Sequence, residues 1–174
     1  MATNNAGNTY IVPTTANEVT KPSQPAFLAR GGAQDANVTG NGTLYTLGQG
    51  NVMVEIFDQN TDFDIGGGGG SGQSTLTAPV TGRYQLDVIL AIKNNENSTR
   101  EEFSLVTSNF TYAEYGLPNQ ATSGNNDANI NISILAEMDA ADTAYVTYMC
   151  DGEGADTSDI GNTPQLWFSG YLAV

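Results

Sequence analysis

The alternation of apolar and polar side chains along the chain predicts β-strands throughout. Side chains of a strand point alternately to two faces, so an apolar residue at every second position indicates a strand with one buried face. Residues 82–94 and 128–138 show this pattern, although Ile89 and Ala91 place apolar side chains on the other face of the first stretch. The expected inward sets are Tyr84, Leu86, Val88, Leu90 and Ile92 in the first stretch, and Ile130, Ile132, Ile134, Ala136 and Met138 in the second.

The remaining chain divides into short segments of the same kind, separated by clusters of Gly, Asn and Asp. No stretch keeps the period of about 3.6 residues that an amphipathic helix requires. About ten short strands of this type predict an all-β fold, a jelly-roll sandwich of two packed sheets.

The last ten residues, 165–174, form a strand pattern that is apolar on both faces. A strand with two apolar faces needs a second sheet on one side and a further partner, such as another subunit, on the other. Trp167 and Tyr171 lie on the second face, and the chain carries more aromatic residues than one small core obviously absorbs. We therefore expect a trimer interface formed by Tyr84, Tyr145, Tyr148, Trp167 and Tyr171.

The first 25 residues differ in composition from the rest of the chain. They are rich in Thr, Asn, Ala and Pro, with Tyr10, Ile11 and Val12 as an apolar cluster. Such a segment buries too little surface to offset its conformational entropy, and its prolines favour an extended chain. We expect residues 1–25 to be an extended anchoring arm that orders on a partner through that cluster, and residues 26–174 to be the trimerising domain.

Charge and composition exclude several classes of function. The chain has 5 basic and 19 acidic residues, a formal charge of −14, which opposes binding to phosphate backbones and anionic lipids. There is no histidine to serve as general base or metal ligand, and the single cysteine, Cys150, is expected to be a buried apolar residue. Without a histidine, and with no carboxylate pair that the sequence assigns, we expect no enzymatic activity, and we expect no cofactor. The sequence shows neither a signal peptide nor a membrane-spanning segment, so we expect synthesis in a cytoplasm.

One loop has the residue types of a cation site. Asp58, Asn60, Asp62 and Asp64 alternate as calcium ligands do, but Phe63 stands where the loop needs a glycine, and the twelfth position is not Glu. These four residues are weak candidates, and no metal is expected.

Several segments together resemble the globular head domain of complement component 1q, in the superfamily that includes tumour necrosis factor. They are residues 56–64, 74–88, 142–146 and 168–172, in this order along the chain. Three positions depart from the family pattern: Leu76 and Leu86, where aromatic residues are usual, and Ala141, where a glycine normally precedes the aspartate. The resemblance implies a ten-stranded, two-sheet jelly roll that assembles as a trimer.

A strongly acidic β domain with a short polar arm is most similar to the versions of this fold in bacteriophage structural proteins. We therefore expect a non-enzymatic virion surface protein, a capsid decoration or head or tail fibre-like homotrimer, synthesised in the host cytoplasm. The arm would bind capsid or tail proteins and the jelly roll would project outward. Two alternatives stay open: a receptor-binding fibre tip that recognises a host glycan or protein, and an extracellular cytokine-like or adhesion module.

Overall fold

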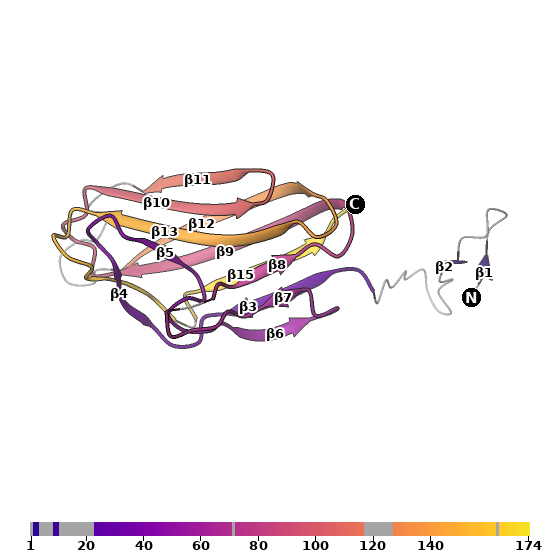
Figure 1. The fold of residues 1–174 in the computed structure, drawn as a ribbon, viewed down its shortest axis with the longest axis horizontal. Helices are drawn as coiled ribbons and strands as arrows, with labels where there is room; N and C mark the ends of the chain where they lie inside the picture. Colours follow the sequence, from indigo (N-terminus) through magenta and orange to yellow (C-terminus); the bar gives the residue numbers. More distant parts are fainter. Residues whose placement is uncertain (1, 4–8, 11–22, 71, 117–126, 163) are drawn as a thin grey trace.

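The structure is a computed structural model that describes residues 2–3, 9–10, 23–70, 72–116, 127–162 and 164–174. The described residues of the main domain form two antiparallel sheets packed face to face, with no helix (Figure 1). The fold is the expected all-β jelly-roll sandwich. A separate pair, β1 (Ala2–Thr3) and β2 (Thr9–Tyr10), lies in the N-terminal segment.

One sheet has six strands and the other has seven. The six-stranded sheet has the order β11 (Thr111–Gly116), β10 (Arg100–Thr107), β13 (Thr143–Asp151), β8 (Thr75–Thr77) and β7 (Phe63–Asp64), with β5 (Leu44–Thr46) also on β13. The seven-stranded sheet has the order β4 (Asp35–Thr39), β14 (Ser158–Ile160), β9 (Gly82–Lys93), β15 (Trp167–Leu172), β3 (Ala26–Arg30) and β6 (Val54–Asp58), with β12 (Asp127–Met138) also on β9.

The two sheets contain more strands than the ten expected because short strands share an edge of a longer one. β10 covers one edge of β13, and β5 and β8 pair with different parts of the other edge. In the same way, β12 covers one edge of β9, while β14 and β15 follow each other along the opposite edge. The long strands β9 and β13 therefore each pair with three other strands and connect the short strands of their sheets.

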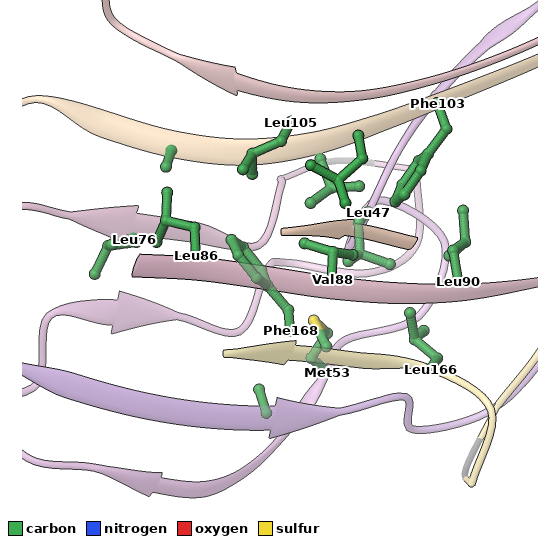
Figure 2. Close-up of a cluster of buried hydrophobic side chains, with 14 of the residues drawn as sticks. Leu47, Met53, Leu76, Leu86, Val88, Leu90, Phe103, Leu105, Leu166 and Phe168 are labelled. Atoms are coloured by element: carbon green, nitrogen blue, oxygen red, sulfur yellow. The ribbon is translucent and has the colours of Figure 1, made fainter. Parts of the chain in front are cut away.

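The core fills the layer between the sheets. Figure 2 shows side chains from both sheets in this layer, among them Leu86 and Val88 of β9 and Leu105 of β10. Three phenylalanine rings pack at its centre: Phe27 stacks on Phe63 with ring centroids 4.3 Å apart, and Phe168 meets both rings edge-on. The inward set expected for β9 is fully buried, which confirms the alternation in that strand.

The turn between β12 and β13 explains one departure from the family pattern. Ala141 has a φ of 74°, a left-handed backbone conformation that glycine adopts without steric cost. The glycine of the family thus has a conformational role, and this chain retains the turn with an alanine in the strained position.

Candidate assembly surface

The outer face of the seven-stranded sheet carries large apolar side chains in neighbouring rows. Ile89 of β9 pairs with Trp167 of β15, and Gln85 pairs with both Tyr171 and Leu135. Ile89, Leu135 and Tyr171 are between 45 % and 53 % exposed, and Trp167 is half-buried. Together with Phe57, which is exposed at the far side of the same sheet, these residues are called the apolar face below.

Three polar side chains lie among the apolar residues of this face. The Ser133 hydroxyl donates to Oδ1 of Asp87 at 2.5 Å, and Nε2 of Gln85 donates to the same oxygen at 3.2 Å and to the Ser133 hydroxyl at 3.0 Å. Polar groups that satisfy one another in this way cost less to bury than isolated ones. The face is therefore suited to contact with another protein surface.

A second apolar surface lies at the open side of the sandwich. Within the described residues, β11 and β12 each pair with one strand only, so both present an unpaired edge on the same side. Between them is a groove of about 430 Å³ lined by Phe110, Tyr112, Ile132 and Ile134, with Thr111, Ala113 and Glu114. Phe110 is 62 % exposed, and its ring lies 5.0 Å from that of Tyr112. This surface is called the edge groove.

An acidic pocket of about 210 Å³ lies farther along the same side. It is lined by Glu101, Glu114, Tyr115, Gly116 and residues 128–131. Glu101 is 3 % exposed, and both of its side-chain hydrogen bonds, from Nδ2 of Asn95 at 2.7 Å and from the Ser98 hydroxyl at 2.9 Å, reach Oε1. Burial raises the pKa of the Glu101 carboxyl, and the nearby Glu153 adds to this. No sequence pattern indicated Glu101, because its burial depends on the pairing of β10 with β11 and β13.

The five aromatic residues expected at a trimer interface do not lie together. Tyr84 and Tyr148 are 0 % and 1 % exposed and belong to the core, so they are not available to a partner. Their positions follow from alternation, because Tyr84 shares the inward face of β9 with Leu86, and Tyr148 shares that of β13 with Val146. The expectation for these two residues is therefore corrected.

The other three occupy outer faces of different sheets. Trp167 and Tyr171 are on the apolar face, where Nε1 of Trp167 donates to the Pro164 carbonyl at 2.6 Å. Tyr145 is half-buried on the outer face of the six-stranded sheet, opposite in direction to Tyr148. A seam through the apolar face can thus contain Trp167 and Tyr171 but not Tyr145 of the same chain.

The expected anchor falls mostly outside the described residues. Tyr10 lies in β2, where its backbone pairs with that of Ala2. Ile11 and Val12 are not among the residues that the structure describes. Their role as an anchor remains a proposal.

In the oxygen-rich segment 58–64, carboxylates accept hydrogen bonds from nearby backbone N–H groups. Oδ2 of Asp58 accepts from the Phe63 N–H at 2.8 Å, Oδ1 of Asp58 accepts from the Asn60 N–H at 3.4 Å, and Oδ1 of Asp64 accepts from the Gly66 N–H at 2.9 Å. Oδ2 of Asp62 is buried and accepts no hydrogen bond from the residues that the structure describes, and desolvation raises the pKa of this carboxyl. The described part of the chain contains no group of three metal-ligating acids, histidines or cysteines.

The burial of the single cysteine agrees with the sequence. Cys150 is fully buried, and burial raises the pKa of its thiol, which disfavours the reactive thiolate. Across the described ranges, no helix is long and apolar enough to cross a bilayer.

Comparison with known proteins identifies the fold. No family model matches the chain, and no curated protein sequence is significantly similar to it. Among solved structures, murine APRIL has a TM-score of 0.54 at 6 % identity, covering 86 % of this chain and 99 % of that one. The globular domain of zebrafish complement 1qA has a TM-score of 0.53 at 14 % identity, with coverage of 87 % and 98 %. Eiger TNF from S. frugiperda has a TM-score of 0.52 at 7 % identity, with coverage of 87 % and 94 %.

These likenesses extend over most of each chain at identities that reveal fold alone. The chain has the jelly-roll fold of complement 1q and tumour necrosis factor-like proteins. Its function has to be argued from its own surfaces.

Proposed function

We propose that the protein is a non-enzymatic, homotrimeric surface protein of a bacteriophage virion, attached through residues 1–25 with the jelly roll projecting outward. The observation that supports assembly is the presence of two different apolar surfaces on one chain, the apolar face and the edge groove. Exposed apolar surface of this extent on a small β domain is typical of an interaction site.

Two different surfaces favour a ring over a two-fold dimer. A two-fold contact uses the same patch on both subunits, whereas contact between unlike patches is head-to-tail and closes into a ring when the rotation allows it. The apolar face is the outer face of the seven-stranded sheet, and the edge groove lies along the strand edges at the side of the sandwich. The normals to both surfaces are therefore perpendicular to the strands. Placing the groove of one copy on the face of the next is therefore a rotation about the strand direction, and three copies close the ring.

The energetic gain from such a contact is large relative to domain stability. Burying one large apolar side chain contributes roughly 1.5–3 kcal/mol. Trp167, Tyr171, Ile89 and Leu135 would be buried on one side of each seam, and Phe110 on the other, at three equivalent places. The polar triad around Asp87 keeps its internal hydrogen bonds when it is covered.

The ends of the chain support attachment through the N-terminal segment. The Leu172 N–H donates to the Pro25 carbonyl at 2.9 Å, and the Arg83 N–H donates to the Val174 carbonyl at 2.8 Å, so β3 begins where β15 ends (Figure 1). Residues 1–22 are therefore connected at that end of the sandwich. Loops such as 94–99 and 152–157 lie at the opposite end, where an outward-projecting domain would present them (Figure 1).

The negative charge fits a role that requires neither nucleic acid nor membrane binding. A formal charge of −14 keeps copies soluble until they assemble and opposes contact with phosphate backbones. Assembly on capsid or tail proteins through a polar arm requires neither of those partners.

The trimer is tested by sedimentation at micromolar concentration. We expect the wild-type chain to sediment as a trimer, and the double variant Trp167→Ala with Tyr171→Ala to shift towards monomer or aggregate. Each truncation of a buried interfacial aromatic costs about 2–4 kcal/mol, and the loss recurs at every seam. Leu44→Ala is the control, because Leu44 is an exposed apolar residue that belongs to the six-stranded sheet and not to the apolar face. A monomeric wild type, or a double variant that stays trimeric, would refute this assignment.

Attachment is tested by deleting residues 1–24. The expected product is a soluble trimer that no longer joins virions when full-length tagged chain does, as seen by electron microscopy of labelled particles. Efficient attachment of the truncated trimer would show that the jelly roll makes the contact. Failure of the truncated chain to fold would show that the arm belongs to the domain.

A further inference from the structure

The acidic pocket lies beside the edge groove, on the side of the sandwich that the proposed trimer covers. Its lining includes Glu101 and Glu114 and, among the described residues, no lysine or arginine. Burying a carboxylate without a nearby positive charge carries a desolvation cost. A cationic group supplied from outside the chain would offset that cost.

The second oxygen of Glu101 lies beside a residue that lines the pocket. The hydrogen bonds from Asn95 and Ser98 both end on Oε1, while Oε2 lies beside Gly116, where a built Cβ would be 2.5 Å from it. Gly116 lines the same pocket, and its lack of a side chain leaves room for the Glu101 carboxylate. Nearby, Oδ1 of Asn95 is buried and accepts no hydrogen bond from the described residues. The pocket therefore presents hydrogen-bond acceptors and suits a ligand that carries hydrogen-bond donors.

The strand register determines which part of the apolar face is level with this pocket. Arg30 of β3 pairs with Trp167, Trp167 with Ile89, and Ile89 with Asn131, so these four residues form one row across the sheet. Asn131 is also a lining residue of the acidic pocket. Arg30 and the pocket are consequently at the same level along the strand direction.

In a closed ring, the position of a residue along the strand direction determines which residues of the next subunit it faces. Rotation about the strand direction without translation brings residues of one row opposite residues of the same row in the next copy. The row of Tyr171 and Leu135 is then level with the apolar edge groove at Ile134, and the row of Arg30 is level with the acidic pocket. Apolar residues meet apolar ones and a cation meets carboxylates.

We propose that the acidic pocket binds the guanidinium group of Arg30 from the neighbouring subunit, an inference that rests on the proposed trimer. A guanidinium carries five N–H donors in a planar fork, which matches a carboxylate and also allows contacts within its own chain. Nη1 of Arg30 makes one such contact, to the Gly31 carbonyl at 3.1 Å. Oε2 of Glu101 and the carboxylate of Glu114 are the acceptors in the pocket.

The test is a double-mutant cycle on the trimer dissociation constant, measured by sedimentation over a range of concentrations. Arg30→Gln and Glu101→Gln should each raise the dissociation constant by roughly ten- to hundredfold, as for other close charge pairs at interfaces. The dissociation constant of the double variant should be no higher than that of the more strongly affected single variant, because the two single variants and the double variant all lose the same interaction. Glu114→Gln, at an exposed position, repeats the cycle without changing a buried group.

Two further variants separate the pocket from general charge effects. Gly116→Ala keeps every charge but would displace the Glu101 carboxylate, so it should weaken the trimer as well. Arg100→Gln removes a cation paired with Glu102 on the outer face of the six-stranded sheet and should have no effect. Strictly additive losses in both cycles, or an unchanged trimer in Arg30→Gln, would overturn the pairing while leaving the trimer intact. A monomeric wild-type chain would overturn both proposals.

Discussion

We expect the substitution Tyr→Phe to change the free energy of unfolding in opposite directions at two buried tyrosines of the core. Tyr84 donates its hydroxyl to the Val80 carbonyl at 2.8 Å, whereas the Tyr148 hydroxyl is buried beside the Cys150 thiol, a weak acceptor, and has no hydrogen-bond partner of normal geometry among the described residues. Burial raises the pKa of both phenols, so both are neutral at physiological pH. The two residues therefore differ mainly in whether the hydroxyl is satisfied.

The magnitudes follow from this difference. An unsatisfied buried hydroxyl costs about 1–3 kcal/mol of desolvation, so Tyr148→Phe should raise the free energy of unfolding by at least about 1 kcal/mol. A satisfied hydrogen bond contributes about 0.5–1.5 kcal/mol, so Tyr84→Phe should lower the free energy of unfolding by about that amount. For a chain of this size, 1 kcal/mol corresponds to about 2–4 °C in melting temperature.

Urea unfolding followed by the fluorescence of the single tryptophan measures both effects. All variants are compared at one protein concentration, because assembly stabilises the folded state by mass action. The comparison of two Tyr→Phe changes cancels the general effect of removing a phenolic oxygen. A loss of stability in Tyr148→Phe that equals or exceeds the loss in Tyr84→Phe would refute the argument.

Two more predictions concern the loops. Ala141→Gly should stabilise the fold by up to about 1 kcal/mol, because a left-handed alanine costs about 1–2 kcal/mol and the greater chain entropy of unfolded glycine cancels part of this gain. The control Ala140→Gly, at a neighbouring position without positive φ, should destabilise the fold. Thermal melts in which both variants shift the melting temperature in the same direction would contradict the proposed strain at Ala141. Asp62 has a pKa raised above its ordinary 3.8, so the native state binds its proton more tightly than the unfolded state and loses stability as pH rises through that raised pKa. Asp62→Asn should remove this decline from urea unfolding curves measured at increasing pH above the ordinary pKa of 3.8. An unchanged pH profile would show that the carboxyl is not desolvated.

The period-two pattern predicted the strands that carry the core. In β9 it identified the inward set correctly, because a long central strand must bury one continuous face whatever its neighbours are. In β15 it identified two apolar faces, and the structure buries Phe168 while leaving Tyr171 half exposed. Local alternation is sufficient for these statements because each depends on one strand only.

The pattern could not assign the aromatic residues to core or interface. Alternation placed Tyr84 inward, but a count of aromatic residues suggested a surplus, since composition does not reveal how much volume two sheets enclose. The sandwich absorbs both Tyr84 and Tyr148 beside the three packed phenylalanines. Whether an inward aromatic fits is a property of the assembled core.

The acidic pocket and the edge groove depend on still longer-range relations. β11 and β12 follow each other in the chain but join different sheets, which leaves their unpaired edges on one side of the sandwich. Exposed strand edges invite pairing with other chains, and proteins commonly cover them. A neighbouring apolar face laid on this side would cover both edges and the buried carboxylate between them. The same contact would thus protect the chain against aggregation and hold the proposed assembly together.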